Sequence, residues 1–214
     1  MDGRRLKMDK SIFHDIQQNT DEWMKMKLGK FSASMTNDLF AGKSTKDYND
    51  AITNVAFERI TGKRQKQFSN KWMDYGHETE PEALENYEIE TFNRVSNGGI
   101  YILNEWVCAS PDGGIEGQNG GVEFKCPAVS TYRDYLEQME KFDKVIIPKN
   151  YELQMQFQMY VSGFEFVDYM PYYDSSVKQI LARVNRDEGT QIAITLKLNE
   201  AIRDVQDLMI KIKR

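Results

Sequence analysis

Two acids and a lysine are spaced so that they could meet at the end of a predicted β-hairpin. Val122-Glu123-Phe124-Lys125 alternates apolar and polar residues, which is typical of a strand. Side chains repeat every two residues along a strand, so Glu123 and Lys125 share one face while Val122 and Phe124 point into the core. Asp112 lies eleven positions before Glu123, where a hairpin would bring it back beside that residue. The sequence therefore predicts two carboxylates and an ammonium group converging at one end of a sheet.

This set of side chains is suited to cutting phosphodiester bonds. Carboxylate oxygens are the ligands that hard cations such as Mg²⁺ prefer, and a nearby lysine can orient or activate a water molecule. A Glu-x-Lys pair on a half-exposed strand is, by itself, more often a solvated surface than an active site. Pro111-Asp112-Gly113 at hairpin distance favours the active site, because two adjacent acids are costly to hold together unless a positive charge lies between them.

Turn residues and hydrophobic periodicity predict the elements that must position these groups. Gly113-Gly114 and Gly120-Gly121 are turn signals, so we expect turns there and a central strand over residues 121–126. Further strands are expected over residues 99–103, 106–109, 164–173 and 178–185. Helices are expected over residues 20–28, 35–40, 48–60, 72–92, 131–142, 151–161 and from 187 onward.

The length and composition fit a single globular domain. The chain has 214 residues, of which 40% are hydrophobic, enough for a sizeable core. We expect a polar lead-in over residues 1–19 and one domain over residues 20–214. No apolar run approaches the roughly 20 residues that span a bilayer, and no signal-peptide pattern opens the chain. Two cysteines give no disulfide framework and no iron–sulfur or zinc spacing, so a reducing, intracellular setting is predicted, with no membrane partner.

Charge is distributed unevenly along the chain, whose net charge is −5. Residues 21–71 carry ten Lys or Arg against six acids, whereas residues 72–143 carry four against fifteen. A basic segment facing an acidic one suits a protein that grips phosphate beside a metal site, although uneven surface charge alone gives the same pattern. The basic loop over residues 61–71 could contact a DNA backbone or simply be solvated.

Two other stretches carry polar groups that need partners. Ser32 and Ser34 lie at the entry of the second helix near Lys27 or Lys30, and could bind a phosphate with free backbone N–H groups, although serines there usually only cap the helix. The helix over residues 151–161 contains three glutamines in an apolar context. Gln154 and Gln158 share a face, and unpaired buried amides cost about 1–3 kcal/mol each, so a buried partner or a substrate is expected.

Taken together, these stretches resemble the lambda-exonuclease-like (YqaJ) viral recombinase family, of the PD-(D/E)xK nuclease superfamily. The resemblance runs from about residue 20 to the end. Its landmarks are Glu22-Trp23, Lys27-Leu28-Gly29, Ser32-Ala33-Ser34, Gly76-x-x-x-Glu80, Ser110-Pro111-Asp112-Gly113, Glu123-Phe124-Lys125-Cys126-Pro127 and Tyr151-x-x-Gln154-x-Gln156. It implies an α/β (α+β) fold with a restriction-endonuclease-like core, a central mixed sheet flanked by helices.

The resemblance also implies an activity. It is that of a magnesium-dependent exonuclease that digests one strand of duplex DNA from the 5′ end and leaves a 3′ overhang for a single-strand annealing protein. Asp112, Glu123 and the carbonyl of Phe124 would bind two Mg²⁺ ions, with Mn²⁺ as a substitute. Glu80 would bind metal directly or through water. Lys125 would position or activate the attacking water, and Gln154 would support the site.

Lys27 and Ser34 match the positions that the family uses for the 5′-terminal phosphate. Position 27 is arginine in the lambda enzyme, and a lysine lacks the two-pronged grip of a guanidinium, which bears on how strictly a 5′ phosphate is required. A ring-shaped homotrimer is implied by the best-known member of the family. The alternatives are an endonuclease or a bidirectional single-strand nuclease with the same core, and a catalytically inactive module that binds DNA ends during recombination.

Overall fold

The structure is a computed structural model that describes residues 10–64 and 71–213, and the side chains of residues 71–77 lie outside that description. Its strands are β1 (Ile12–His14), β2 (Val95–Asn97), β3 (Ile100–Ile102), β4 (Cys108–Ala109), β5 (Gly113–Ile115), β6 (Gly120–Lys125), β7 (Phe166–Pro171) and β8 (Ala182–Asn185). Its helices are α1 (Asp21–Lys27), the 3₁₀ helix η1 (Ala33–Met35), α2 (Thr36–Phe40), α3 (Lys46–Thr61), α4 (Lys71–Thr91), α5 (Val129–Phe142), α6 (Lys149–Ser162) and α7 (Glu188–Ile212).

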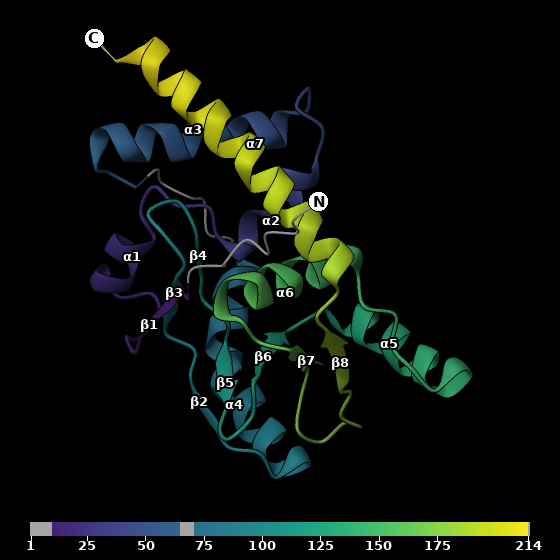
Figure 1. Cartoon of the computed structure of the whole chain (residues 1–214). Helices are drawn as coiled ribbons and strands as arrows, with labels where there is room; N and C mark the ends of the chain where they lie inside the picture. The colour runs from purple at the N-terminus through teal and green to yellow at the C-terminus, as the bar shows by residue number, and fades with distance from the viewer. Residues whose placement is uncertain (1–9, 65–70, 214) are drawn as a thin grey trace, which may run out of the picture.

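A five-stranded mixed sheet with the order β2-β5-β6-β7-β8 forms the centre of the fold (Figure 1). β6 and β7 run parallel, which requires a crossover, and α5 and α6 provide it. The other neighbours pair antiparallel. Helices flank both faces, so the predicted mixed α/β fold is confirmed.

Alternation along β6 and β7 sorts the side chains between these two faces. Val122 and Phe124 pack with Ala83 and Tyr87 of α4. On the neighbouring strand, Tyr169 belongs to the opposite face, where side chains of α6 and β8 cover it. Glu123 is paired in register with Tyr169 and has the opposite parity to Val122 and Phe124, so it faces α6.

A second, three-stranded antiparallel sheet has the order β1-β3-β4. The strands expected over residues 99–103 and 106–109 form two of its members, in shorter versions. β1 was not predicted, and it lies within the segment expected to be a polar lead-in. A further core cluster lies between α3, α6 and α7 and reaches β4, and α7 crosses α3 (Figure 1).

A threonine and a glycine mark the two ends of α1. Thr20 caps α1 by accepting a hydrogen bond from the backbone N–H of Trp23, and Gly29 follows the helix with a φ of 66°. Pro81 lies inside α4. Residues 65–70 of the predicted basic loop lie outside the described residues. No helix within residues 10–64 and 71–213 has the length and apolar character needed to cross a membrane.

The prediction of turns at the two glycine pairs was wrong. Gly113 and Gly114 belong to β5 and Gly120 and Gly121 to β6, while the chain turns over residues 116–119. The physical reason is close packing against the strands, since a Cβ at Gly120 would lie 2.3 Å from the Phe166 ring and one at Gly121 2.7 Å from the Phe164 ring. A glycine within a strand marks such an approach as readily as it marks a turn.

Candidate active site

The β5–β6 hairpin brings Asp112 and Glu123 to the same end of the central sheet. Gly113 pairs with Val122, which puts the preceding Asp112 opposite Glu123. The backbone N–H of Phe124 donates to Oδ2 of Asp112 over 2.7 Å. Glu123 is only 1% exposed, so this strand face is buried and not a solvated surface.

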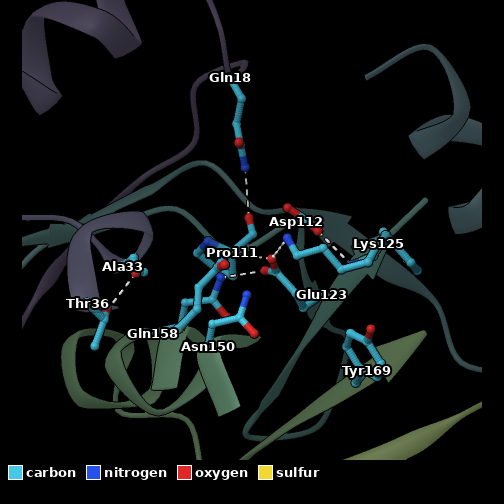
Figure 2. Close-up of polar contacts among 12 residues, drawn as sticks. Gln18, Ala33, Thr36, Pro111, Asp112, Glu123, Lys125, Asn150, Gln158 and Tyr169 are labelled. Atoms are coloured by element: carbon cyan, nitrogen blue, oxygen red, sulfur yellow. Dashed lines mark hydrogen bonds and ion pairs between the residues drawn. The ribbon is translucent and has the colours of Figure 1, made fainter. Parts of the chain in front are cut away.

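Lys125 extends from the same face and pairs with Oε1 of Glu123 (Figure 2). Burial lowers the pKa of Lys125, but the charges of Glu123 and Asp112 outweigh it and hold that pKa above its ordinary value. Burial and then the charge of Glu123 raise the pKa of Asp112 well above the usual range of a carboxyl group. One ammonium group therefore balances only part of the negative charge at this position.

Two glutamines of α6 hold the Glu123 carboxylate. Nε2 of Gln154 lies 2.6 Å from Oε1, and Nε2 of Gln158 lies 2.6 Å from Oε2. The third glutamine, Gln156, turns aside and donates to the backbone carbonyl of Asn185. The partner expected for the glutamine face of this helix is thus Glu123. Only Gln154 was assigned to the site from the resemblance, so the role of Gln158 at the same carboxylate is new.

Glu80 approaches the site from α4 on the other side of the hairpin. Burial, followed by the charges of Glu80 and Asp112, raises the pKa of Cys126 to about 11. The charge of Glu80 also contributes to the raised pKa of Asp112, after burial and Glu123. The structure therefore brings Glu80 within electrostatic reach of Asp112.

These oxygen atoms are suited to a hard divalent cation. Within the described part of the chain, no three His, Cys, Asp or Glu side chains form a metal-binding group. The nearest donors are the carboxylates of Asp112 and Glu123 and the backbone oxygen between them, with Glu80 within electrostatic reach. The N–H and C=O of one strand residue leave the strand on the same edge. The carbonyl of Phe124 therefore lies on the Asp112 side of β6, where its N–H already bonds that acid. Acids in excess of one lysine, together with this carbonyl, are the kind of donors that Mg²⁺ prefers.

The three residues before β5 are each tied to another part of the fold. Ser110 accepts a 2.9 Å hydrogen bond from Nε1 of Trp23 in α1. The carbonyl of Pro111 accepts one of 2.8 Å from Gln18, a residue of the predicted lead-in (Figure 2). Asp112 follows directly. Residues of the N-terminal segment thus help to fix the loop that presents the first acid.

A separate polar pocket contains both residues predicted to bind a 5′ phosphate. Lys27 at the end of α1 and Ser34 in η1 line it together. Lys30, Ser32 and Arg64 join them from adjacent segments. The hydroxyl oxygens of Ser32 and Ser34 lie 3.2 Å apart. Burial lowers the pKa of Lys27, whose ammonium nitrogen lies 4.5 Å from the centroid of the Trp23 ring.

Arg64 is a basic residue of the pocket whose position there the sequence did not predict. It was counted with the basic loop over residues 61–71, and only the return of the chain from the end of α3 brings it to Lys27. The pocket is also lined by Glu58, whose carboxylate accepts a hydrogen bond from the backbone N–H of Gly29. That bond fixes the backbone directly after α1, between the pocket residues Leu28 and Lys30.

Solved structures share this fold. An alkaline exonuclease from Laribacter hongkongensis is 26% identical, with a TM-score of 0.78 over 91% of this chain and 97% of that one. Its complex with dAMP gives 27% identity, the same TM-score and the same coverage. A phage-related exonuclease from Haemophilus somnus 129PT, 17% identical with a TM-score of 0.64 over 86% of this chain and 96% of that one, has a similar fold.

No curated protein sequence matches the chain. The domain described as the YqaJ-like viral recombinase domain matches residues 22–165, which include Lys27, Ser34, Asp112, Glu123, Lys125 and Gln154. This match spans well over half of the sequence and agrees with the resemblance drawn from the motifs. The chain belongs to the YqaJ-like viral recombinase family.

Proposed function

We propose that this protein is a magnesium-dependent DNA exonuclease that digests one strand of a duplex from its 5′ end and leaves a 3′ single-stranded overhang. The observation that carries the proposal is the grouping of the buried Glu123 with the half-buried Asp112 and Lys125 at one end of the hairpin. Membership of the YqaJ-like family and the similarity to an alkaline exonuclease support the reaction class.

Each side chain has a role that follows from its position. Asp112, Glu123 and the Phe124 carbonyl would hold two divalent cations, Mg²⁺ or Mn²⁺, with Glu80 binding directly or through water. Such cations lower the pKa of a water molecule and neutralise charge on the scissile phosphate and on the departing 3′ oxygen. Lys125 remains a cation because of its acidic neighbours, so it would orient the attacking water and stabilise negative charge as the phosphate is attacked.

The polar pocket gives the proposed polarity its support. Lys27, Lys30 and Arg64 supply positive charge, and Ser34 supplies a hydroxyl donor, which together suit a terminal phosphate. A 5′-phosphorylated end bound there would orient the strand before its first bonds are cut. The lysine at position 27 makes point-charge contacts, so a preference for 5′ phosphate is proposed here and not an absolute requirement.

The proposed partners follow from this reaction. The substrate is the end of double-stranded DNA, and a single-strand annealing protein would take over the 3′ overhang in phage-type recombination. A ring-shaped homotrimer would keep the enzyme on the duplex between cuts. Such an enzyme would work in the cytoplasm of the bacterial host, where phage DNA recombines.

Digestion of end-labelled linear duplex tests the proposal. We expect Mg²⁺-dependent release of label from the 5′ end, survival of label at the 3′ end of the same strand until late times, and no cutting in EDTA. Ca²⁺ should support DNA binding with little cleavage, because it accepts looser coordination. Cutting of covalently closed circles would point instead to an endonuclease. Binding of ends without cleavage in Mg²⁺ or Mn²⁺ would leave only an inactive recombination module.

A further inference from the structure

Gln154 and Gln158 lie one helical turn apart on α6 and donate to different oxygens of one carboxylate. Gln154 contacts Oε1 of Glu123, and Gln158 contacts Oε2, each over 2.6 Å. The terminal torsion of a glutamate side chain is broad, so one contact leaves the carboxylate plane free to rotate. Contacts at both oxygens fix that plane. Figure 2 shows Gln158 directed at Glu123 from the helix.

The two oxygens of Glu123 have different surroundings. Gln158 is fully buried, so Oε2 faces the interior of the protein. Oε1 is shared by Gln154 and Lys125, and a quarter of the Lys125 side chain is exposed. Oε1 is therefore the outer oxygen, with partners that can rearrange, whereas Oε2 is the inner oxygen, with a buried partner.

The other end of the Gln158 amide is left without a partner. Among the residues that the structure describes, none forms a hydrogen bond with the buried Oε1 of Gln158. Turning the amide over would put this oxygen against the Glu123 carboxylate, and two acceptors would then face each other at 2.6 Å. An unsatisfied buried acceptor is unfavourable, and an apolar residue of similar size would avoid it. The hydrogen bond that Gln158 donates to Glu123 is what this unsatisfied acceptor is retained for.

We propose that Gln158 is a positioning residue for the nuclease reaction. It holds the inner oxygen of Glu123, so the outer oxygen stays directed at the divalent cations and the scissile phosphate. The inference rests on the proposed function and adds to it a residue that the motif resemblance does not include. Groups that orient a metal ligand typically contribute about 10- to 100-fold to metal affinity or activity.

Gln156 provides a matched control on the same helix. It is 2% exposed and as well embedded as Gln158, but its amide bonds Asn185, Asp187 and Gln191 on the other side of α6. The glutamines that donate to Glu123 are Gln154 and Gln158. Gln156→Met should therefore weaken α6 in general without affecting the position of the Glu123 carboxylate.

The test is a Mn²⁺ titration of the full chain without DNA, by calorimetry, for the wild type, Q158M, Q158N and Q156M. We expect Q158M and Q158N to bind Mn²⁺ at least 10-fold more weakly, and the Mg²⁺ concentration for half-maximal cleavage to rise by a similar factor. Q156M should melt at a lower temperature than the wild type and keep its Mn²⁺ affinity. Should Q158M fail to fold, Q158N carries the comparison, because it keeps the amide on a shorter stem.

Two results would overturn the inference in distinguishable ways. If the wild type binds Mn²⁺ and the Gln158 variants bind it equally well, the positioning role is wrong while the nuclease proposal stands. If the wild type neither binds Mn²⁺ nor cuts DNA, the proposed function itself is wrong. A loss of Mn²⁺ affinity in Q156M equal to that in Q158M would also contradict the inference, since it would show a general effect of α6.

Discussion

Phe124 donates its backbone N–H to Oδ2 of Asp112, and this 2.7 Å hydrogen bond joins the loop before β5 to β6. The bond holds an acid that is otherwise unfavourably placed, because burial and the charge of Glu123 raise the pKa of Asp112 well above its usual range. A carboxylate kept in place at such a cost is typical of a site that gathers cations. The same relationship leads to a prediction about stability.

Replacing Asp112 with Asn should stabilise the metal-free protein while abolishing cleavage. An acid whose pKa is raised on folding lowers stability as the pH rises from about 4 through the raised value, because the folded state retains a proton that the unfolded chain has lost. Asp112→Asn removes that loss and keeps an acceptor for the N–H of Phe124. We expect its melting temperature in EDTA at pH 8 to exceed that of the wild type by at least about 2–4 °C, and the difference to shrink toward pH 4. A lower melting temperature at pH 8 would contradict this.

Lys125→Ala should separate turnover from binding. If Lys125 orients water and stabilises developing charge, the single-turnover rate in Mg²⁺ should fall by about 100-fold or more. The affinity for duplex ends, measured in Ca²⁺, should change little. If the affinity for duplex ends falls while the turnover rate is preserved, Lys125 binds the DNA phosphate and does not take part in the chemical step.

The polar pocket predicts a preference among DNA ends. Charge-assisted hydrogen bonds from Lys27 and Ser34 to a phosphate contribute about 1.5–3 kcal/mol each. Ends with a 5′ phosphate should therefore be degraded faster than 5′-hydroxyl ends, and Lys27→Ala with Ser34→Ala should erase the difference. Lys27→Arg should keep or sharpen it. Initial rates on the two kinds of end give the measurement.

Lys25→Ala is the control for this comparison. Lys25 is exposed on the same helix, and it is not among the residues that line the pocket. Its replacement removes the same charge as Lys27→Ala. The Lys25→Ala variant should prefer 5′-phosphate ends as strongly as the wild type does. Equal wild-type rates on both kinds of end, or digestion from the 3′ end, would refute the assigned polarity and leave the nuclease core unaffected.

Tyr87→Phe should weaken the attachment of α4, the helix that carries Glu80. The Tyr87 hydroxyl donates to Oδ2 of Asp168 over 2.7 Å, and Arg183 pairs with both oxygens of the same buried acid. Loss of a hydrogen bond to a charged group lowers the free energy of unfolding by about 1.5–3 kcal/mol. Urea denaturation measures it. Tyr160→Phe removes a longer hydroxyl contact to Thr195 and should cost less than half as much.

Local chemistry explains why much of the fold and part of the site could be predicted. Thr20 carries its own capping signal, and the alternation around Glu123 and Lys125 fixes which residues share a strand face. Asp112 and Glu123 are likewise only eleven residues apart, so a single hairpin is enough to bring them together. These predictions depend on neighbours within about a dozen residues.

The features that were missed depend on contacts between distant segments. Gln158 and Glu123 are separated by 35 residues, and their bond exists only because α6 lies over the sheet face from which Glu123 extends. The strand glycines are explained by the rings of Phe164 and Phe166, which a turn rule does not include. β1 has three residues, too few to show a strand pattern, and it is defined by its pairing with β3. Arg64 reaches the pocket through the path of α3 and the residues after it.

Residues 110–112 join β4 of one sheet to β5 of the other, and Trp23 ties this link to the helix that carries Lys27. Because the link is three residues long and bonded at each of them, it leaves little freedom between the pocket and the acids. Under the proposed function, this link sets a fixed distance between a bound 5′ end and the bond that is cut. The products should therefore be of uniform length, and lengthening this loop by one residue should make them ragged.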